Sequence, residues 1–261
     1  MTQIIAFAGK KQSGKNTCCN FITMLKLIES GVCKKARLSD SGDIEVSDVF
    51  GETTDEEYFP FKEPYVNVDA VLEQMRSVKI YALADPLKRI AIDVFGLPED
   101  KVYGTDDDKN ELTHLLWENM PGMYTETDKG LLGLVKYHEP GPMTIREFLQ
   151  YLGTDIFRKM FSDVWINALL SRIEKDSPDI ALVCDVRFDN EIKLLKEKGA
   201  LVVGLKRDLF KSKDQHSSEK VNLSLCHQTI NNQDLDIPEL NKEVYFALKD
   251  LDCKNLTDLG V

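Results

Sequence analysis

The sequence predicts an α/β fold in which a parallel sheet of about five strands is flanked by helices. A compact apolar run, Ile4 to Ala8, ends at a glycine-rich segment, and apolar residues at helical spacing follow that segment. Over residues 180–206 the pattern reads strand, helix, strand, which is a βαβ unit with parallel strands. Further strands are expected at 78–83 and 227–230, before a last helix at about 238–251. Strands and helices that alternate in this way build a doubly wound sheet.

Two regions interrupt this pattern. Residues 36–70 are acidic and rich in turn formers, which predicts a hairpin and loop inserted at the surface, with no function that the sequence reveals. Residues 98–142 carry Pro and Gly around an apolar stretch at 112–117, and we expect a small helical subdomain there. The predicted plan is a single domain with a core at about 1–35, 77–95 and 144–261, an insertion at 36–76, a middle segment at 96–143 and a lid at 206–220.

Composition and charge exclude several classes of protein. The net charge of -11 and the pI near 5.0 argue against a surface that attracts nucleic acid, so a phosphate-containing ligand must bind at a local site. No stretch approaches the roughly 18 apolar residues of a membrane span, and the apolar run near the start is too short for a signal peptide. The six cysteines contain no C-x-x-C pair, which predicts reduced thiols. We therefore expect a cytoplasmic protein with neither nucleic acid nor a membrane as partner.

Residues Gly9 to Thr17, Gly-Lys-Lys-Gln-Ser-Gly-Lys-Asn-Thr, match a phosphate-binding loop between a strand and a helix. Glycines let successive backbone N–H groups point inward, and the helix N-terminus adds partial positive charge. Lys15 can reach the β and γ phosphates of a nucleotide. Asn16 stands where the strict pattern has Ser or Thr, and Thr17 comes one residue later. This ending resembles the Gly-Lys-x-Thr of many nucleoside monophosphate kinases and leaves direct Mg²⁺ coordination by Thr17 open.

Asp185 and Arg187 are predicted just beyond the carboxyl end of the 180–184 strand, at the edge where open α/β sheets bind ligands. They should therefore face the same crevice as the phosphate loop. The carboxylate of Asp185 would act on Mg²⁺, directly or through water, and Arg187 would stabilise charge on a transferred phosphoryl group. An ordinary Asp/Arg turn is the alternative interpretation.

Arg146 and Gln150 lie four residues apart in a segment, Thr144 to Asp155, whose apolar residues predict the buried face of a helix. Arg146 would then be free to bind an acceptor phosphate in a bidentate manner, although a solvated arginine fits the pattern as well. A basic segment that begins with Lys206 and Arg207 predicts a lid, which would exclude water from the transferred group. A solvated run of charges is the alternative.

With these motifs the sequence resembles the deoxynucleoside monophosphate kinases of tailed bacteriophages. The resemblance covers most of the chain, and its motifs are specific together although each is weak alone. Besides the phosphate loop, the residues that carry it are Leu83 to Lys88, Tyr103 to Asn110, Leu112 to Trp117, Thr144 to Asp155, Trp165, Asp185 to Glu191, and His216 to Glu219.

The resemblance implies a phosphate-loop kinase fold that transfers a phosphoryl group from ATP, with Mg²⁺, to a deoxynucleoside monophosphate held by the middle segment. Such an enzyme would supply precursors for viral DNA synthesis in the host cytoplasm. With the residue arguments above, the catalytic set is Lys15, Arg187, Arg146 and Asp185. The set that contacts the phosphates of ATP is Lys11, Gly14, Lys15, Asn16, Thr17 and Arg207. The metal would be served by Thr17 and Asp185, through water. The acceptor set is Leu87, Lys88, Arg146, Gln150, Gly153, Thr154, Trp165 and Glu191.

Other functions remain open at this point. A dephospho-coenzyme A kinase would share the loop and the sheet, but the block at 103–117 points away from it. A nucleotide-gated switch is supported by Asp-x-x-Gly matches at Asp48 and Asp93, yet Asp93 falls in an expected helix and the Asn-Lys-x-Asp guanine motif is missing. Base preference stays open because Gln12 and Phe188 differ from the residues of some relatives. The sequence is compatible with both a monomer and a homodimer.

Overall fold

The computed structural model describes residues 2–49, 57–62, 71, 77–121, 139–207 and 221–253. By its internal contacts the chain divides into two compact units. The first consists of Met1–Leu83 and Ile166–Val261, and the second of Ala84–Trp165. The middle of the sequence therefore forms a unit of its own.

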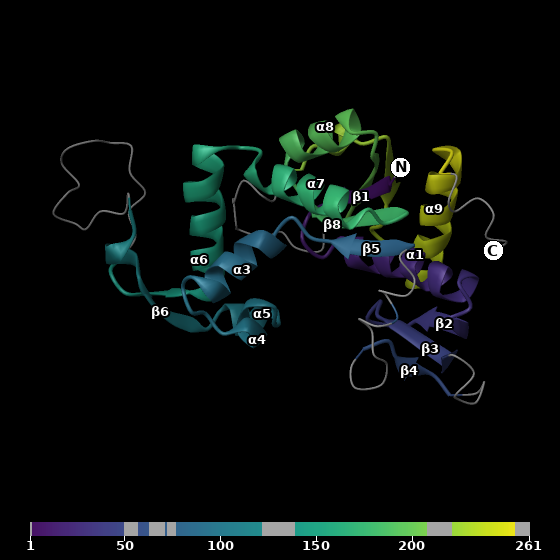
Figure 1. Ribbon diagram of the computed structural model, residues 1–261, viewed down its shortest axis with the longest axis horizontal. Coiled ribbons are helices and arrows are strands. Elements are labelled where there is room, and N and C mark those ends of the chain that lie inside the picture. The colour runs from purple at the N-terminus through teal and green to yellow at the C-terminus, as the bar shows by residue number, and fades with distance from the viewer. Residues whose placement is uncertain are drawn as a thin grey trace. The chain divides into compact units, whose positions relative to one another are not determined.

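The first unit is built on a five-stranded sheet in which every neighbouring pair of strands is parallel (Figure 1). The strand order is β10-β9-β1-β8-β5, so β1 lies at the centre. This confirms the predicted five-stranded parallel sheet. The strands are β1 (Gln3–Gly9), β5 (Val78–Tyr81), β8 (Ile180–Val186), β9 (Leu201–Lys206) and β10 (Gln228–Asn231).

Helices cover this sheet on both sides. Ile5 and Phe7 of β1 belong to one buried apolar cluster together with residues of α1 and α9. On α8, Ile192 and Leu195 are fully buried outside that cluster, and Figure 1 shows α8 across the sheet from α1. Because side chains alternate along a strand, each strand contributes apolar side chains to the helix layers on both faces of the sheet. The helices are α1 (Lys15–Glu29), α7 (Val164–Asp176), α8 (Asp189–Glu197) and α9 (Ile237–Asp250).

The inserted region forms a small antiparallel sheet of its own. Its strands are β2 (Cys33–Leu38), β3 (Ile44–Val49) and β4 (Phe59–Pro60), in that order. The predicted hairpin is confirmed, although its first strand begins at Cys33 rather than after residue 35. Val46 is fully buried and belongs to the same cluster as α1. The insertion is thus joined to the main core on its apolar side.

The second unit combines short helices with one strand pair. The helical prediction for 98–142 is wrong at β6 (Leu112–Leu116), which pairs antiparallel with β7 (Pro142–Thr144). The hydroxyl of Thr113 donates to the carbonyl of Met143 at 2.9 Å. Because the partner strand lies about thirty residues further along the chain, local periodicity could not reveal it. The helices wholly within this unit are α3 (Asp85–Asp93), α4 (Glu99–Val102), α5 (Asp106–Lys109), α6 (Ile145–Gln150), the 3₁₀ turn η1 (Trp117–Asn119) and the π-helical segment η3 (Tyr151–Arg158).

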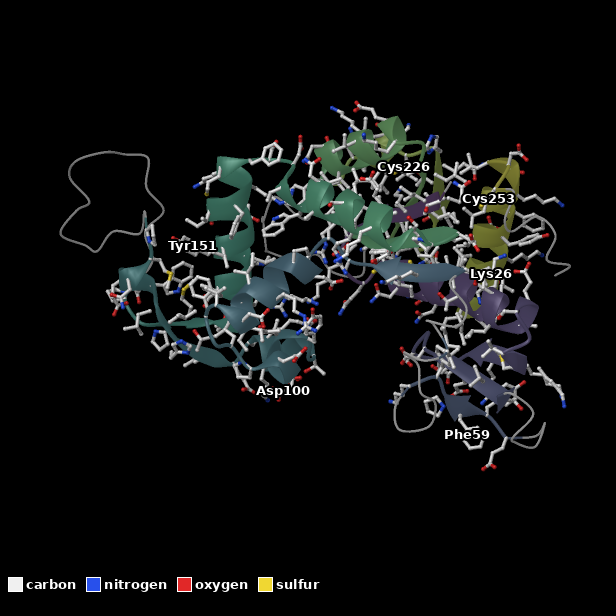
Figure 2. The ribbon with its side chains drawn as sticks, viewed as in Figure 1. Lys26, Phe59, Asp100, Tyr151, Cys226 and Cys253 are labelled. Atoms are coloured by element: carbon white, nitrogen blue, oxygen red, sulfur yellow. The ribbon has the colours of Figure 1, made fainter. Side chains whose placement is uncertain are left out.

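Aromatic rings hold the second unit together. Phe148 is fully buried, with its ring centroid 4.8 Å from that of Phe95 in an edge contact. Tyr151 (Figure 2) lies 6.0 Å from Trp117 between ring centroids, and its hydroxyl donates to the carbonyl of Pro121 at 2.6 Å. These contacts join η3 to the end of β6.

The remaining sequence predictions have mixed outcomes. Most of the predicted lid and parts of the insertion and middle segment lie outside the described residues, at 208–220, 50–56, 63–70 and 122–138. Among the helices that the structure describes, none combines the length and the apolar character needed to cross a membrane. All six cysteines are free thiols, as predicted; Cys253, just after α9 (Figure 2), is fully buried.

Candidate phosphate-binding site

The glycine-rich loop leaves the central strand β1 and enters α1 at Lys15, as the sequence predicted. Gly14 has a φ of 92° and precedes the helix as its N-cap. Gln12 also has a positive φ, of 59°, which is rare for a residue with a side chain. Left-handed residues within a tight loop turn backbone N–H groups toward one side, which creates a binding site for anions. The loop therefore has the backbone form that phosphate binding requires.

Lys15 is enclosed by its own loop. Its side chain is buried, and its ammonium donates to the carbonyl of Gly9 at 2.9 Å, to the carbonyl of Lys10 and to the hydroxyl of Ser13 at 3.3 Å. A buried ammonium is stable only when hydrogen bonds replace water. The carbonyl oxygens satisfy the Lys15 ammonium, and a phosphate oxygen would be a stronger partner for it.

Two glycines let neighbouring strands approach the loop closely. A Cβ on Gly9 would lie 2.7 Å from the carbonyl oxygen of Leu205, on β9. A Cβ on Gly14 would lie 2.9 Å from the amide nitrogen of Asn232, which follows β10. Asn232 was absent from the sequence prediction. The available signal was its place directly after the last strand of the sheet, at the carboxyl edge.

The residues after Lys15 differ in exposure. Asn16 is exposed, whereas Lys11 and Thr17 are half-buried. Thr17 lies against Gly42 in the turn between β2 and β3, and one helical turn later the Asn20 amide donates to the Gly42 carbonyl at 2.9 Å. The insertion therefore reaches the start of α1, which the sequence did not indicate.

Asp185 lies within β8, because this strand continues to Val186. The prediction that the strand ends at 184 is wrong by two residues. Between the pairs Ala6 with Val183 and Ala8 with Val186, β8 contains one residue more than β1, which is a bulge beside Asp185. Bulges re-aim side chains and are common next to functional sites. The Asp185 carboxylate accepts the backbone N–H of Leu83 at 2.7 Å, so it links β8 to the end of β5.

Arg187 leaves β8 at the same edge of the sheet. Its backbone N–H and that of Phe188 donate to the carboxylate of Glu191, at 2.9 and 3.0 Å. Glu191 is only 1% exposed and caps the N-terminus of α8. Glu191 thus fixes the backbone position of Arg187.

Arg207 directly follows β9, the strand beside β1. Its Nε atom is buried and has no hydrogen-bond partner within the part of the chain that the structure describes. Burying a guanidinium N–H group without a hydrogen-bond partner costs free energy, so an acceptor at this position would stabilise the protein. The predicted phosphate contact of Arg207 would supply one.

On the second unit, Arg146 has protein partners. Its Nε donates to the side-chain oxygen of Asn110 at 3.0 Å, and its Nη2 pairs with the carboxylate of Asp106 at 2.8 Å. These partners lie at the two ends of α5. The expectation of a free arginine on the helix surface is wrong, because α5, which precedes β6, lies against this face of α6.

Three residues of the predicted acceptor set meet in the interior of the second unit. The indole N–H of Trp165 donates to the carbonyl of Gly153 at 3.1 Å, and a Cβ on Gly153 would lie 2.6 Å from the Leu87 side chain. Leu87 and Trp165 are buried. Thr154 is half-buried, Gln150 is exposed, and the Lys88 ammonium lies 4.3 Å from the centre of the Tyr103 ring.

Comparisons with known proteins agree with this geometry. Residues 123–244 match the family described as "Deoxynucleotide monophosphate kinase". This match covers just under half of the chain. The matched segment contains Arg146, Asp185, Arg187 and Asn232 but begins well after the phosphate loop.

Two proteins that are similar to this chain come from viruses. A "Deoxynucleoside-5'-monophosphate kinase" of Escherichia phage T5 is 34% identical over 110 residues, 38% of this chain and 44% of the relative. A "Putative deoxynucleotide monophosphate kinase" of Acanthamoeba polyphaga mimivirus is 26% identical over 153 residues, 53% of this chain and 65% of the relative. The chain therefore spans less than two thirds of each relative.

The oxygen donors of this site suit a magnesium ion carried by a nucleotide. Within the described ranges, no group of three or more His, Cys, Asp or Glu residues could hold a metal ion by itself. Mg²⁺ in nucleotide sites is typically held by one or two protein oxygens, by waters and by the phosphates themselves. The Asp185 carboxylate and the Thr17 hydroxyl, both half-buried, are hard oxygen donors of this kind.

Proposed function

We propose that this protein transfers the γ-phosphoryl group of ATP to a deoxynucleoside monophosphate, with ADP and a deoxynucleoside diphosphate as products. The observation that carries the proposal is the phosphate loop at the centre of a parallel sheet, closed around the buried ammonium of Lys15. The partial family match and the names of the viral relatives support a deoxynucleotide acceptor. Such an activity would supply precursors for viral DNA synthesis in the host cytoplasm, where free thiols persist.

On the donor side, Lys15 would exchange the carbonyls of Gly9 and Lys10 for the β and γ phosphates. Arg187, held by the Glu191 cap, and Arg207 would add positive charge around the transferred group, and Lys11 and Asn16 would contact the phosphates. Phosphoryl transfer of this kind requires positioning and charge stabilisation, and no covalent intermediate.

Bound Mg²⁺ would neutralise charge that develops between the β and γ phosphates. Asp185 and Thr17 are the residues that would hold it, through water. The bulge in β8 and the bond from the Leu83 N–H give the Asp185 carboxylate a fixed orientation for this role.

On the acceptor side, Arg146 would bind the phosphate of the deoxynucleotide. Asp106 and Asn110 engage its Nε and Nη2 atoms, while its Nη1 has no partner within the residues that the structure describes. Two N–H groups of an oriented guanidinium suit a phosphate oxygen. The buried positions of Leu87, Gly153 and Trp165 suit a supporting role behind this arginine, with Lys88, Gln150 and Thr154 nearer to solvent.

The activity is tested by following ADP release with each deoxynucleoside monophosphate, each ribonucleoside monophosphate and dephospho-coenzyme A. Turnover with one or more deoxynucleotides is expected. Activity on dephospho-coenzyme A alone would favour that alternative enzyme, and nucleotide binding without any turnover would favour a switch.

Two substitutions separate the donor and acceptor roles. Lys15→Ala should lower kcat by about a thousand-fold, since it removes charge that matters most in the transition state. Lys35→Ala, at an exposed position on β2, is the matched control. Arg146→Ala should raise KM for the acceptor at least ten-fold with little change for ATP, and the reverse pattern would move Arg146 to the donor side.

A further inference from the structure

Asn232 is a buried asparagine that contacts the phosphate loop from outside. It directly follows β10, and its backbone N–H donates to the carbonyl of Lys206 at 2.9 Å. The residue is 1% exposed, and its side-chain amide donates to the carbonyl of Ser13 at 2.8 Å. A residue 219 positions further along the chain therefore controls one carbonyl group of the loop.

The bond to Ser13 determines how the next peptide group is oriented. In a planar trans peptide the carbonyl oxygen and the following N–H point in opposite directions. Because the Asn232 amide holds the carbonyl of Ser13, the N–H of Gly14 must point away from Asn232. A phosphate loop binds anions through N–H groups that face its interior, so the direction of this one peptide matters for binding.

Gly14 and Asn232 are sterically matched. A Cβ at Gly14 would lie 2.9 Å from the Asn232 amide nitrogen and 3.2 Å from Leu240 of α9. The φ of 92° at Gly14 is in the left-handed region as well. The loop can adopt this form only because position 14 lacks a side chain where the amide of Asn232 enters.

The cost of burying Asn232 argues against a purely packing role. Its side-chain oxygen is buried without a hydrogen-bond partner among the residues that the structure describes. An apolar residue would fill the same space without leaving an acceptor unsatisfied. The feature that an apolar residue lacks is the N–H group donated to Ser13.

We propose that Asn232 is a positioning residue of the phosphate loop: by holding the Ser13 carbonyl, it directs the Gly14 N–H toward the triphosphate. This inference rests on the proposed nucleotide-binding function and adds a residue to its site. The residue orients a donor and does not itself touch the reacting atoms.

The test compares Asn232→Ala and Asn232→Asp with the control Asn231→Ala. Asn231 is exposed and adjacent in sequence. Aspartate keeps the shape of asparagine and removes the donated N–H. Calorimetry measures the affinity for magnesium ATP and for magnesium tripolyphosphate, which has no base or ribose. Urea unfolding measures stability, and steady-state kinetics measure KM for each substrate.

Both Asn232 variants should bind ATP and tripolyphosphate roughly ten-fold more weakly, as expected when one oriented hydrogen bond is lost. KM for the deoxynucleotide should stay unchanged, and the Asn231 variant should match the parent protein. Even if alanine impairs folding, the aspartate variant, matched in shape, carries the comparison.

Three results would overturn the inference while leaving the proposed function intact. The first is an unchanged affinity of the folded Asn232→Asp variant for ATP and tripolyphosphate. The second is weakened binding of ATP but not of tripolyphosphate. The third is a rise in KM for the deoxynucleotide as large as the rise in KM for ATP. Failure of the parent protein to bind any triphosphate would instead refute the proposed function itself.

Discussion

Replacing Gly42 by alanine should destabilise the first unit through Thr17. Gly42 has a φ of 82°, a conformation that costs an alanine about 1–2 kcal/mol. A Cβ at this position would also lie 2.5 Å from the Thr17 hydroxyl oxygen and 3.1 Å from its methyl carbon. Relieving such overlap in a packed site costs about 1–3 kcal/mol. Allowing for a stiffer unfolded chain, we expect a loss of about 2–4 kcal/mol in the free energy of unfolding.

Gly31 provides the matched control. Its φ is 72°, and a Cβ there would meet no atom within 4 Å. Gly31→Ala therefore carries the backbone strain without the steric overlap, and should cost about 1 kcal/mol. The difference between the two variants isolates the contact with Thr17.

Urea unfolding followed by circular dichroism measures both variants, and a double-mutant cycle with Thr17→Ala checks the partner. Removing the Thr17 side chain should restore about 1 kcal/mol or more in the Gly42→Ala background. ATP affinity should fall several-fold in Gly42→Ala and stay unchanged in Gly31→Ala. Equal destabilisation by the two alanines, or additive effects in the cycle, would refute the claim that the turn presses on Thr17.

Three further predictions concern single interactions. Trp165→Phe should lower the free energy of unfolding by about 1–2 kcal/mol because the Gly153 carbonyl loses its buried donor; an unchanged urea midpoint would contradict this. Hydrogen bonds from Thr105 lower the pKa of Asp108 to about 2. The ionised Asp108 carboxylate therefore stabilises the fold fully above the unfolded pKa of 3.8, and this stabilisation is lost as the pH falls toward 2. NMR titration of the Asp108 carboxyl group should show the low pKa, and Thr105→Ala should raise it. Burial raises the pKa of Cys226 to about 11. A thiol reagent at pH 8 should therefore label Cys226 slowly in the native protein, and should label all six cysteines quickly in urea. Fast labelling of Cys226 in the native protein would be inconsistent with its burial.

Much of the first unit could be predicted because its signals are local. An apolar run that ends at Gly9 and leads into helical spacing reflects interactions between residues close in sequence, and so does the βαβ pattern at 180–206. The helix start at Lys15 and the left-handed Gly14 follow from the same short motif. The strand end after Asp185 was missed because a bulge depends on the register with β1, which no local pattern encodes.

The partners of the site residues could not be predicted, since they come from distant parts of the chain. Asp106 and Asn110 reach Arg146 across about forty residues, and β6 finds its partner strand at a similar separation. Helical spacing shows which face of a helix is polar but does not show what lies against that face. The sequence therefore suggested a free arginine where the fold provides an oriented one.

By itself the sequence determined the phosphate loop, because backbone curvature and an adjacent lysine are properties of nine consecutive residues. The tertiary structure alone decided how that loop is held. Asn232, directly after the last strand, donates a hydrogen bond to the Ser13 carbonyl, and the turn at Gly42 packs against Thr17. The physical reason is that a hydrogen bond or a steric contact acts over a few ångströms in space, whatever the distance along the chain. The parallel sheet brings these distant residues to the end of its central strand.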